Sequence, residues 1–267
     1  MSNVFLKRER WELQVLVSRW RLRCRYLLAA PFVYRNWWAM LTANRRNSPV
    51  VLELRNGLKY QIRPRTGDVG VNNESMVLNP YLRPGYVTLT ATSTVVDVGA
   101  NIGDFAMQTA RLCPQGTIYA IEPVPEQCEM IKAQIKLNSV SNVQVIPLAV
   151  GSENGEIELF VSGSQSSMYW GTGGRTRVQV TTLDRIMEQH PIQRIDLLKM
   201  DCEGAEWDIF PLSARVLPAV SQICMEYHNG KRTAEWLEGW LVQHGFRVHR
   251  TPGPWCGLLW AWHAQSG

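Results

Sequence analysis

The sequence predicts a mixed α/β fold built on a largely parallel sheet. From Ser93 onward, short β-branched runs alternate with helical patterns, and this alternation is typical of strands joined by crossover helices. The composition agrees with a globular chain, since 45% of the 267 residues are apolar and 19% are charged. This length suits one large domain or two small ones.

The N-terminal segment, residues 1–48, is expected to be basic and helical. Residues 1–46 hold ten basic and two acidic side chains, a net charge of +8. A helix over residues 10–28 would carry an apolar stripe flanked by arginines, made of Leu13, Leu16, Val17, Trp20, Cys24, Leu27 and Leu28. Either the stripe packs on the domain that follows, or residues 10–41 lie on an anionic membrane surface. A contact with a partner protein or a nucleic acid is the third option.

Hydropathy and the number and spacing of the cysteines indicate the cellular compartment of the protein. No run of about 18 uncharged apolar residues is present, which argues against a membrane-spanning helix. Charged residues recur through the N-terminal segment, which argues against a cleaved signal peptide. The six cysteines form no CxxC pair and show no metal-ligand spacing. We therefore expect a cytoplasmic protein, peripheral at the inner membrane face if the N-terminal helix binds lipid.

Residues 49–92 are expected to form a β-hairpin and a connector that pack on the main domain, residues 93–267. Two β-rich runs, 50–54 and 58–62, flank Asn56-Gly57, and this dipeptide favours the positive φ angles of a type I′ turn. A polar connector with Pro80 and Pro84 follows.

The main domain is predicted to have seven strands and five helices. The strands are expected near residues 94–98, 117–122, 143–149, 195–200, 219–226, 246–250 and 257–262. The helices are expected near residues 102–112, 125–138, 182–190, 203–212 and 233–244. An insertion over residues 151–181 has a Gly- and Ser-rich centre between two strand-like runs, and such loops commonly carry substrate contacts.

A glycine-containing elbow follows the first of these strands. Asp97 lies near the strand end, and Gly99, Asn101 and Gly103 follow it before a helix begins. Glycines allow a sharp turn and the close approach of a ligand to the helix N-terminus. The spacing is Gly-x-x-x-Gly rather than Gly-x-Gly-x-x-Gly, and Asp97 suits a cationic or amine-bearing ligand better than a pyrophosphate. The elbow is therefore a candidate cofactor site.

Glu122 ends the second strand of the main domain, immediately before Pro123. A carboxylate at this place can accept hydrogen bonds from both hydroxyls of a ribose. The alternative is a solvated glutamate that caps the next helix.

These motifs together resemble the FkbM family of S-adenosylmethionine-dependent methyltransferases over roughly residues 50–262. The resemblance is carried by the elbow Asp97 to Gly103, Glu122-Pro123, Thr182-Leu183-Asp184, the stretch Lys199 to Glu206, and Glu226-Tyr227-His228. It implies a Rossmann-like seven-stranded methyltransferase sheet with helices on both faces and an antiparallel last strand. It also implies O-methylation of hydroxyls on sugars, polyketides or related secondary metabolites. On this pattern Asp97, Gly99, Asn101 and Gly103 would line the methionine end of S-adenosylmethionine, and Glu122 would hold the ribose.

Carboxylates and an imidazole follow two further strands. Asp201 comes after the fourth strand, and Glu226 and His228 end the fifth. Asp201 is the first choice for the base that removes the proton of an acceptor hydroxyl, and His228 is the second. Alternatively, Asp201 and Glu226 hold a Mg²⁺ or Mn²⁺ ion that binds a diol. Lys199 either takes part in this chemistry or pairs with a neighbouring carboxylate.

Other classes of function remain open. A nicotinamide-dependent oxidoreductase is disfavoured, because Gly-x-Gly-x-x-Gly is missing from the elbow. The alternative outside the enzymes is a non-catalytic binding protein. It would keep the cofactor fold and dock to a membrane or a partner through its basic N-terminus. A nucleic-acid partner is disfavoured because the chain from residue 47 onward has a net charge of −3. We expect a small-molecule or glycan acceptor with a hydroxyl group.

Overall fold

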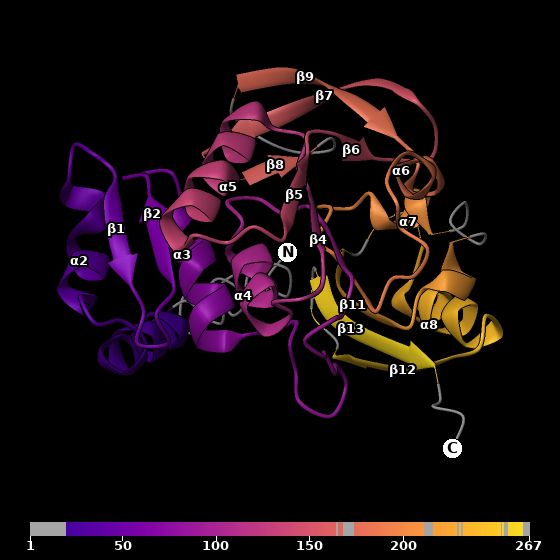
Figure 1. The fold of residues 1–267 in the computed structure, drawn as a ribbon, viewed down its shortest axis with the longest axis horizontal. Coiled ribbons are helices and arrows are strands. Elements are labelled where there is room, and N and C mark those ends of the chain that lie inside the picture. The colour runs from indigo at the N-terminus through magenta and orange to yellow at the C-terminus, as the bar shows by residue number, and fades with distance from the viewer. Residues whose placement is uncertain are drawn as a thin grey trace, which may run out of the picture.

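The centre of the molecule is a seven-stranded sheet (Figure 1). The computed structural model describes residues 20–163, 165–167, 174–210, 216–228, 230, 232–251, 253 and 256–263. The strands are β3 (Val95–Val98), β4 (Ile118–Ile121), β5 (Val143–Ile146), β10 (Leu197–Met200), β11 (Gln222–His228), β12 (Phe246–Thr251) and β13 (Cys256–His263). Their spatial order is β12-β13-β11-β10-β3-β4-β5.

The parallel part of the sheet contains β11, β10, β3, β4 and β5. The last strand, β13, runs antiparallel to β11 and to β12. Every residue of β3, β4 and β10 is buried, which explains why these strands are apolar apart from Asp97 and Lys199. The predicted α/β sheet with an antiparallel last strand is confirmed.

Helices cover both faces of this sheet, as expected (Figure 1). On one face, α4 (Asp104–Leu112) and α5 (Pro125–Asn138) share a core with Val95 and Ile118. The other face carries α6 (Leu183–Gln189), α7 (Glu206–Ile209) and α8 (Ala234–Gln243). The predicted helix over 203–212 starts late, at Glu206, because Glu203 and Gly204 have φ angles of 53° and 103°. These left-handed residues cannot belong to an α-helix.

A second sheet forms from the predicted insertion. It contains β6 (Ala149–Val150), β7 (Gly155–Ser162), β8 (Gln165–Ser167) and β9 (Gly174–Thr181) in the order β6-β9-β7-β8. The predicted third strand, 143–149, is divided, since β5 ends at Ile146 and β6 joins the second sheet. Pro147 lies between them and has no N–H with which to continue the pairing.

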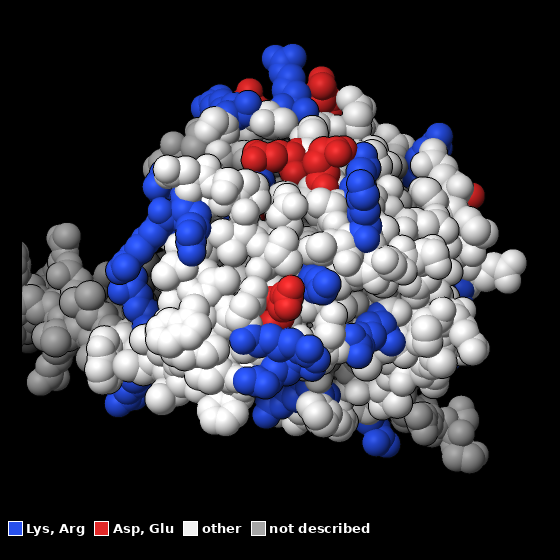
Figure 2. All heavy atoms as spheres, turned by 60° about the vertical axis from the view of Figure 1, so that its left-hand side comes forward, with Lys and Arg blue, Asp and Glu red and all other residues white. Residues whose placement is uncertain are grey.

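Before the main sheet, the chain forms short helices and the predicted hairpin. Residues 20–33 are helical, and α2 (Trp37–Thr42) and the 3₁₀ turn η1 (Ala43–Arg45) follow. The hairpin is formed by β1 (Val50–Glu53) and β2 (Lys59–Ile62), and α3 (Asp68–Asn73) and η2 (Glu74–Leu78) lie in the connector. The expected type I′ turn is wrong, because Gly57 has a positive φ of 92° but Asn56 does not. On this side of the molecule, basic side chains prevail over acidic ones (Figure 2).

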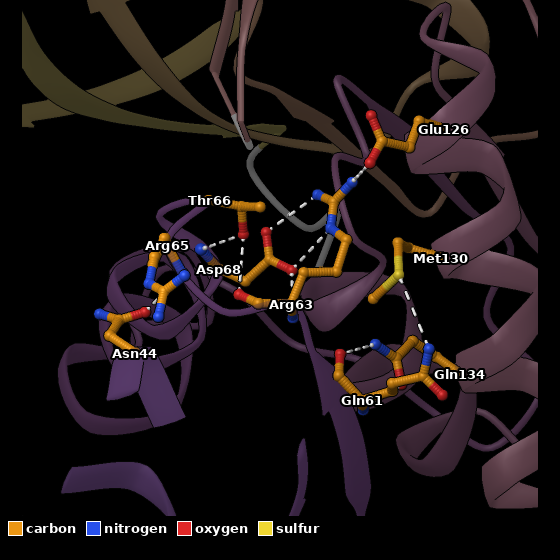
Figure 3. A network of polar contacts seen from close by, with 9 residues as sticks. All are labelled: Asn44, Gln61, Arg63, Arg65, Thr66, Asp68, Glu126, Met130 and Gln134. Carbon is orange, nitrogen blue, oxygen red and sulfur yellow. Dashed lines mark hydrogen bonds and ion pairs between the residues drawn. The ribbon is translucent and has the colours of Figure 1, made fainter. Parts of the chain in front are cut away.

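The hairpin packs on α5 through side-chain amides. Gln134 accepts a hydrogen bond of 2.9 Å from Gln61 N and donates one of 2.8 Å to Gln61 O, so it satisfies the outer edge of β2. Arg63 lies between Asp68 and Glu126, with N···O distances of 2.9 and 2.7 Å (Figure 3). These contacts tie the connector to the helix that follows Glu122.

Part of the predicted N-terminal stripe lies on the outside of the molecule. Trp20, Leu27 and Leu28 are exposed, and Cys24 is half-buried. Leu13, Leu16 and Val17 lie outside the described residues. Ala30 and Tyr34 are the residues buried against the domain. In the part of the chain that the structure describes, no helix is long and apolar enough to cross a membrane.

Candidate functional site

A cavity of about 340 Å³ lies at the carboxyl ends of β3, β4 and β10. Its sheet side is lined by Val98, Gly99, Asn101, Ile121, Glu122, Pro123, Asp201, Cys202 and Glu203. The opposite wall comes from the insertion, through residues 148–157 together with Leu159 and Val180. Ligands of open α/β sheets bind at this edge. The insertion therefore contributes to the site, as its sequence position indicates.

The elbow after β3 can form one wall of the cavity because its backbone turns through left-handed conformations. Gly99, Asn101 and Gly103 have φ angles of 76°, 52° and 83°. A Cβ at Gly99 would collide with the backbone carbonyl oxygen of Asp201. Only glycine allows this approach, and it brings the end of β10 against the elbow.

Glu122 is a buried carboxylate in the wall of the cavity, only 2% exposed. Its Oε2 accepts a hydrogen bond of 2.8 Å from Asn101 N, and its Oε1 accepts one of 2.9 Å from Val124 N. Burial raises the pKa of Glu122 to about 7, although both backbone hydrogen bonds lower it. The two N–H groups fix the carboxylate in one orientation, as recognition of a vicinal diol requires.

Asp97 and Gly103 do not line the cavity, although the sequence pattern groups them with its residues. Asp97 is fully buried, and its Oδ1 lies 3.0 Å from Lys199 Nζ. Lys199 is the register partner of Asp97 on β10, and its Nζ also donates to Gly99 O at 2.8 Å. Lys199 therefore pairs with a neighbouring carboxylate, and the ion pair supports the elbow from behind.

Asp201 lines the cavity and is held by a residue from the connector. Tyr81 OH donates a hydrogen bond of 2.9 Å to Asp201 Oδ2. Tyr81 is 7% exposed, and burial raises its pKa well above 10, so it remains a donor at neutral pH. No motif in the sequence singles out Tyr81, because the chemistry-bearing motifs all lie in the main domain.

His228 lies between two glutamates of the turn that precedes and begins α7. Its Nδ1 is 2.7 Å from Glu206 Oε1, and its Nε2 is 3.5 Å from Glu203 Oε2. Burial by itself would lower the pKa of His228, but Glu206 and Glu203 outweigh it and raise the pKa to about 9. The imidazole is therefore protonated at neutral pH, which favours Asp201 over His228 as a proton acceptor.

Asp201, Glu203 and His228 each offer a ligand atom, and these atoms lie within 4.8 Å of one another. Glu226 is outside this group, although the sequence analysis pairs it with Asp201 as a metal ligand. Burial and the nearby Asp201 raise the pKa of Glu226 to about 7. A divalent ion at this end of the cavity would therefore meet Glu203 rather than Glu226.

Gln127 is a residue of the site that sequence reasoning missed. It lies in the first turn of α5, lines the cavity and is 1% exposed. Its Nε2 has no hydrogen-bond partner among the described residues. A buried donor without a partner is rare in native proteins, and a bound ligand or water would satisfy this one. Its place in the turn after Glu122-Pro123 is the only signal in the sequence.

The strand order and the site at the carboxyl edge define a methyltransferase fold. The solved structure of methyltransferase FkbM from Methylobacillus flagellatus KT superposes with a TM-score of 0.51 at 16% identity, covering 73% of this chain and 54% of that one. The model of the methyltransferase FkbM domain matches residues 97–248, more than half of the chain. The protein therefore belongs to the FkbM methyltransferase family, and the resemblance seen in the sequence is confirmed.

Two curated relatives are similar over part of their length. Methyltransferase 1 of Beauveria bassiana is 30% identical over 144 residues, which are 44% of this chain and 57% of that protein. The 2-O-methyltransferase NoeI of Sinorhizobium fredii is 23% identical over 153 residues, which are 50% of this chain and 62% of that protein. The chain thus spans less than two thirds of either relative.

Proposed function

We propose that this protein transfers a methyl group from S-adenosylmethionine to a hydroxyl oxygen of a sugar, glycolipid or secondary-metabolite acceptor. The observation that carries the proposal is that the buried carboxylate of Glu122 and the carboxylate of Asp201 share one cavity at the carboxyl edge of the sheet. The relative NoeI, a 2-O-methyltransferase by name, supports a hydroxyl acceptor.

The donor set of the cavity suits the nucleoside part of S-adenosylmethionine. Glu122, oriented by two backbone N–H groups, would accept hydrogen bonds from the ribose hydroxyls. The unpartnered Nε2 of Gln127 would donate to the same part of the ligand. Gly99 and Asn101 would form the wall beside the methionine part. When bound, S-adenosylmethionine supplies an electrophilic methyl group on a sulfonium sulfur.

Asp201 is the proposed base. Tyr81 engages Oδ2, so Oδ1 is the candidate acceptor of the hydroxyl proton. Proton removal by such a base contributes about 10² to 10⁴ in rate, and positioning of the hydroxyl contributes the remainder. His228 would stabilise the carboxylates around it as an imidazolium held by Glu206 and Glu203.

A Mg²⁺ or Mn²⁺ ion is the alternative way to activate the hydroxyl. Asp201 and Glu203 would supply oxygen ligands, which these ions prefer, and His228 would supply a nitrogen once its imidazole has lost a proton. Turnover measured with Mg²⁺ and with a chelator separates the two mechanisms, because a base needs no added ion.

The proposal is tested first by calorimetric titration with S-adenosylmethionine and S-adenosylhomocysteine, with NAD as control. We expect micromolar affinity for the first two and none for NAD, and weaker binding after Gln127→Leu or Glu122→Ala. Sugars and glycolipids are then screened as acceptors with Mg²⁺ or with a chelator. Binding without turnover on any acceptor would favour the non-catalytic binding protein, and turnover only with Mg²⁺ would favour the ion over the base.

A further inference from the structure

Exposed large apolar side chains are concentrated at the N-terminal end of the described chain. Of the nine that the described residues contain, seven lie within residues 20–51, namely Trp20, Leu22, Leu27, Leu28, Phe32, Trp38 and Val51. Phe32 is 80% exposed and Leu28 is 74% exposed. Scattered single apolar residues are normal on a surface, but a cluster of this kind marks an interaction site.

The helix over residues 20–33 presents four of these side chains on the face away from the domain. With 100° between successive residues, Trp20, Leu27, Leu28 and Phe32 share one side. The side opposite Leu28 and Phe32 carries Ala30, which is fully buried against the domain. The helix is therefore anchored along one face and offers an apolar stripe on the other.

Basic side chains surround this stripe. Residues 20–65 hold ten lysines and arginines and one acidic residue, Glu53, a net charge of +9. Arg21 lies between Leu28 and Phe32 on the helix surface, and Arg25 and Arg23 lie at the two edges of the stripe; all three arginines are exposed. Figure 2, which views the molecule from the hairpin side, likewise shows more Lys and Arg than Asp and Glu.

We propose that this helix face binds an anionic membrane surface, with Leu27, Leu28 and Phe32 entering the acyl boundary and the flanking arginines at the phosphate headgroups. Residues 20–51 line neither the cavity of the candidate site nor a second cavity beside Pro125 and Arg177, and an exposed helix face fits a flat partner better than a small ligand. A two-fold contact between copies of the chain would bring two strongly basic faces together, and their repulsion disfavours it. The proposal does not depend on the methyl donor or acceptor.

The test is co-sedimentation of the full chain with vesicles of phosphatidylcholine alone and with vesicles that also contain phosphatidylglycerol. We expect binding to the anionic vesicles only, weakened by added salt. The double variant Leu28→Glu/Phe32→Glu should weaken binding by roughly tenfold or more, because burial of the two side chains is lost. The matched control is Leu112→Glu/Val242→Glu, which makes the same change at exposed apolar positions elsewhere. This control should bind as the wild type does.

Light scattering and thermal unfolding of each variant complete the test. An unchanged melting temperature shows that a loss of binding is not a loss of folding. No binding of the wild type to anionic vesicles, or equal loss in both double variants, overturns the proposal. A wild-type dimer that Leu28→Glu/Phe32→Glu dissociates, without vesicle binding, would assign the face to contacts between copies instead.

Discussion

Tyr81 donates a hydrogen bond of 2.9 Å to Asp201, a residue 120 positions further along the chain. The tyrosine belongs to the connector, and the aspartate belongs to the carboxyl edge of the main sheet. The connector also supplies the carbonyl of Tyr81 that accepts a hydrogen bond of 3.1 Å from Trp260 Nε1 on β13. The segment before the family domain is therefore part of the candidate site.

Tyr81→Phe should lower kcat by about tenfold or more and leave the affinity for S-adenosylhomocysteine within about twofold. A hydrogen bond to a charged group is worth about 1.5–3 kcal/mol, and about 1.4 kcal/mol corresponds to tenfold in rate. Tyr34→Phe is the control, because it removes the hydroxyl of another buried tyrosine, which donates to Asn72 and Asn73. Equal kcat losses in both variants would indicate a structural effect only.

Asp201→Asn should retain cofactor affinity and lose about 10² to 10⁴ in turnover, because the amide cannot accept the hydroxyl proton. Calorimetry with S-adenosylhomocysteine measures the first property, and a methyl-transfer assay measures the second. His228→Gln should have the smaller effect, since His228 is already protonated at neutral pH. Unchanged turnover in Asp201→Asn would remove this residue from the reaction.

The affinity for S-adenosylhomocysteine should rise about tenfold between about pH 6 and pH 8, because Glu122 has a pKa of about 7 and accepts ribose hydroxyls best as a carboxylate. Isothermal titration across this range measures the slope. Glu122→Gln should make the affinity nearly independent of pH. An affinity that still rises with pH in this variant would assign the titration to another group.

The raised pKa of Glu122 also predicts that the folded protein loses stability as the pH rises, whereas its cofactor affinity increases. The folded protein holds the Glu122 proton more tightly than the unfolded chain, whose pKa is near 4.5. The free energy of unfolding therefore falls as the pH rises from about 4.5 through 7. Glu122→Gln should remove up to about 3 kcal/mol of this fall. Denaturant unfolding of both proteins at several pH values checks this, and parallel curves for the two would contradict it.

Gly99→Ala should abolish cofactor binding and destabilise the fold by about 2–4 kcal/mol, because the new Cβ meets the carbonyl oxygen of Asp201 at a φ of 76°. Gly70→Ala is the control, since a Cβ there has no atom within 4 Å and its φ is not left-handed. Thermal unfolding and ligand titration measure the stability and the cofactor affinity of the two variants. Equal results for Gly99→Ala and Gly70→Ala would contradict the prediction.

Much of the fold and part of the site were predictable from local pattern. The strands β3, β4 and β10 are short and mostly apolar, and Asn56-Gly57 marks the position of the hairpin turn, although not its expected type. Gln127 and Tyr81 were not predictable, because a glutamine in a helix and a tyrosine in a connector have no distinguishing local pattern. The division of the third strand has a local cause, because Pro147 has no N–H with which to continue the pairing.

The sequence by itself determined the family, the order along the chain of the main-sheet strands and their helices, and the residues at the strand ends, because each of these is encoded in short stretches of the chain. The tertiary structure decided which partner each charged group takes. Lys199 pairs with Asp97 because β10 and β3 are adjacent in register, and this pairing places Asp97 behind the cavity wall. It also decided that Leu28 and Phe32 lie outside rather than in the core. Helical periodicity defines a face but not what that face meets, since that depends on contacts between segments distant in sequence.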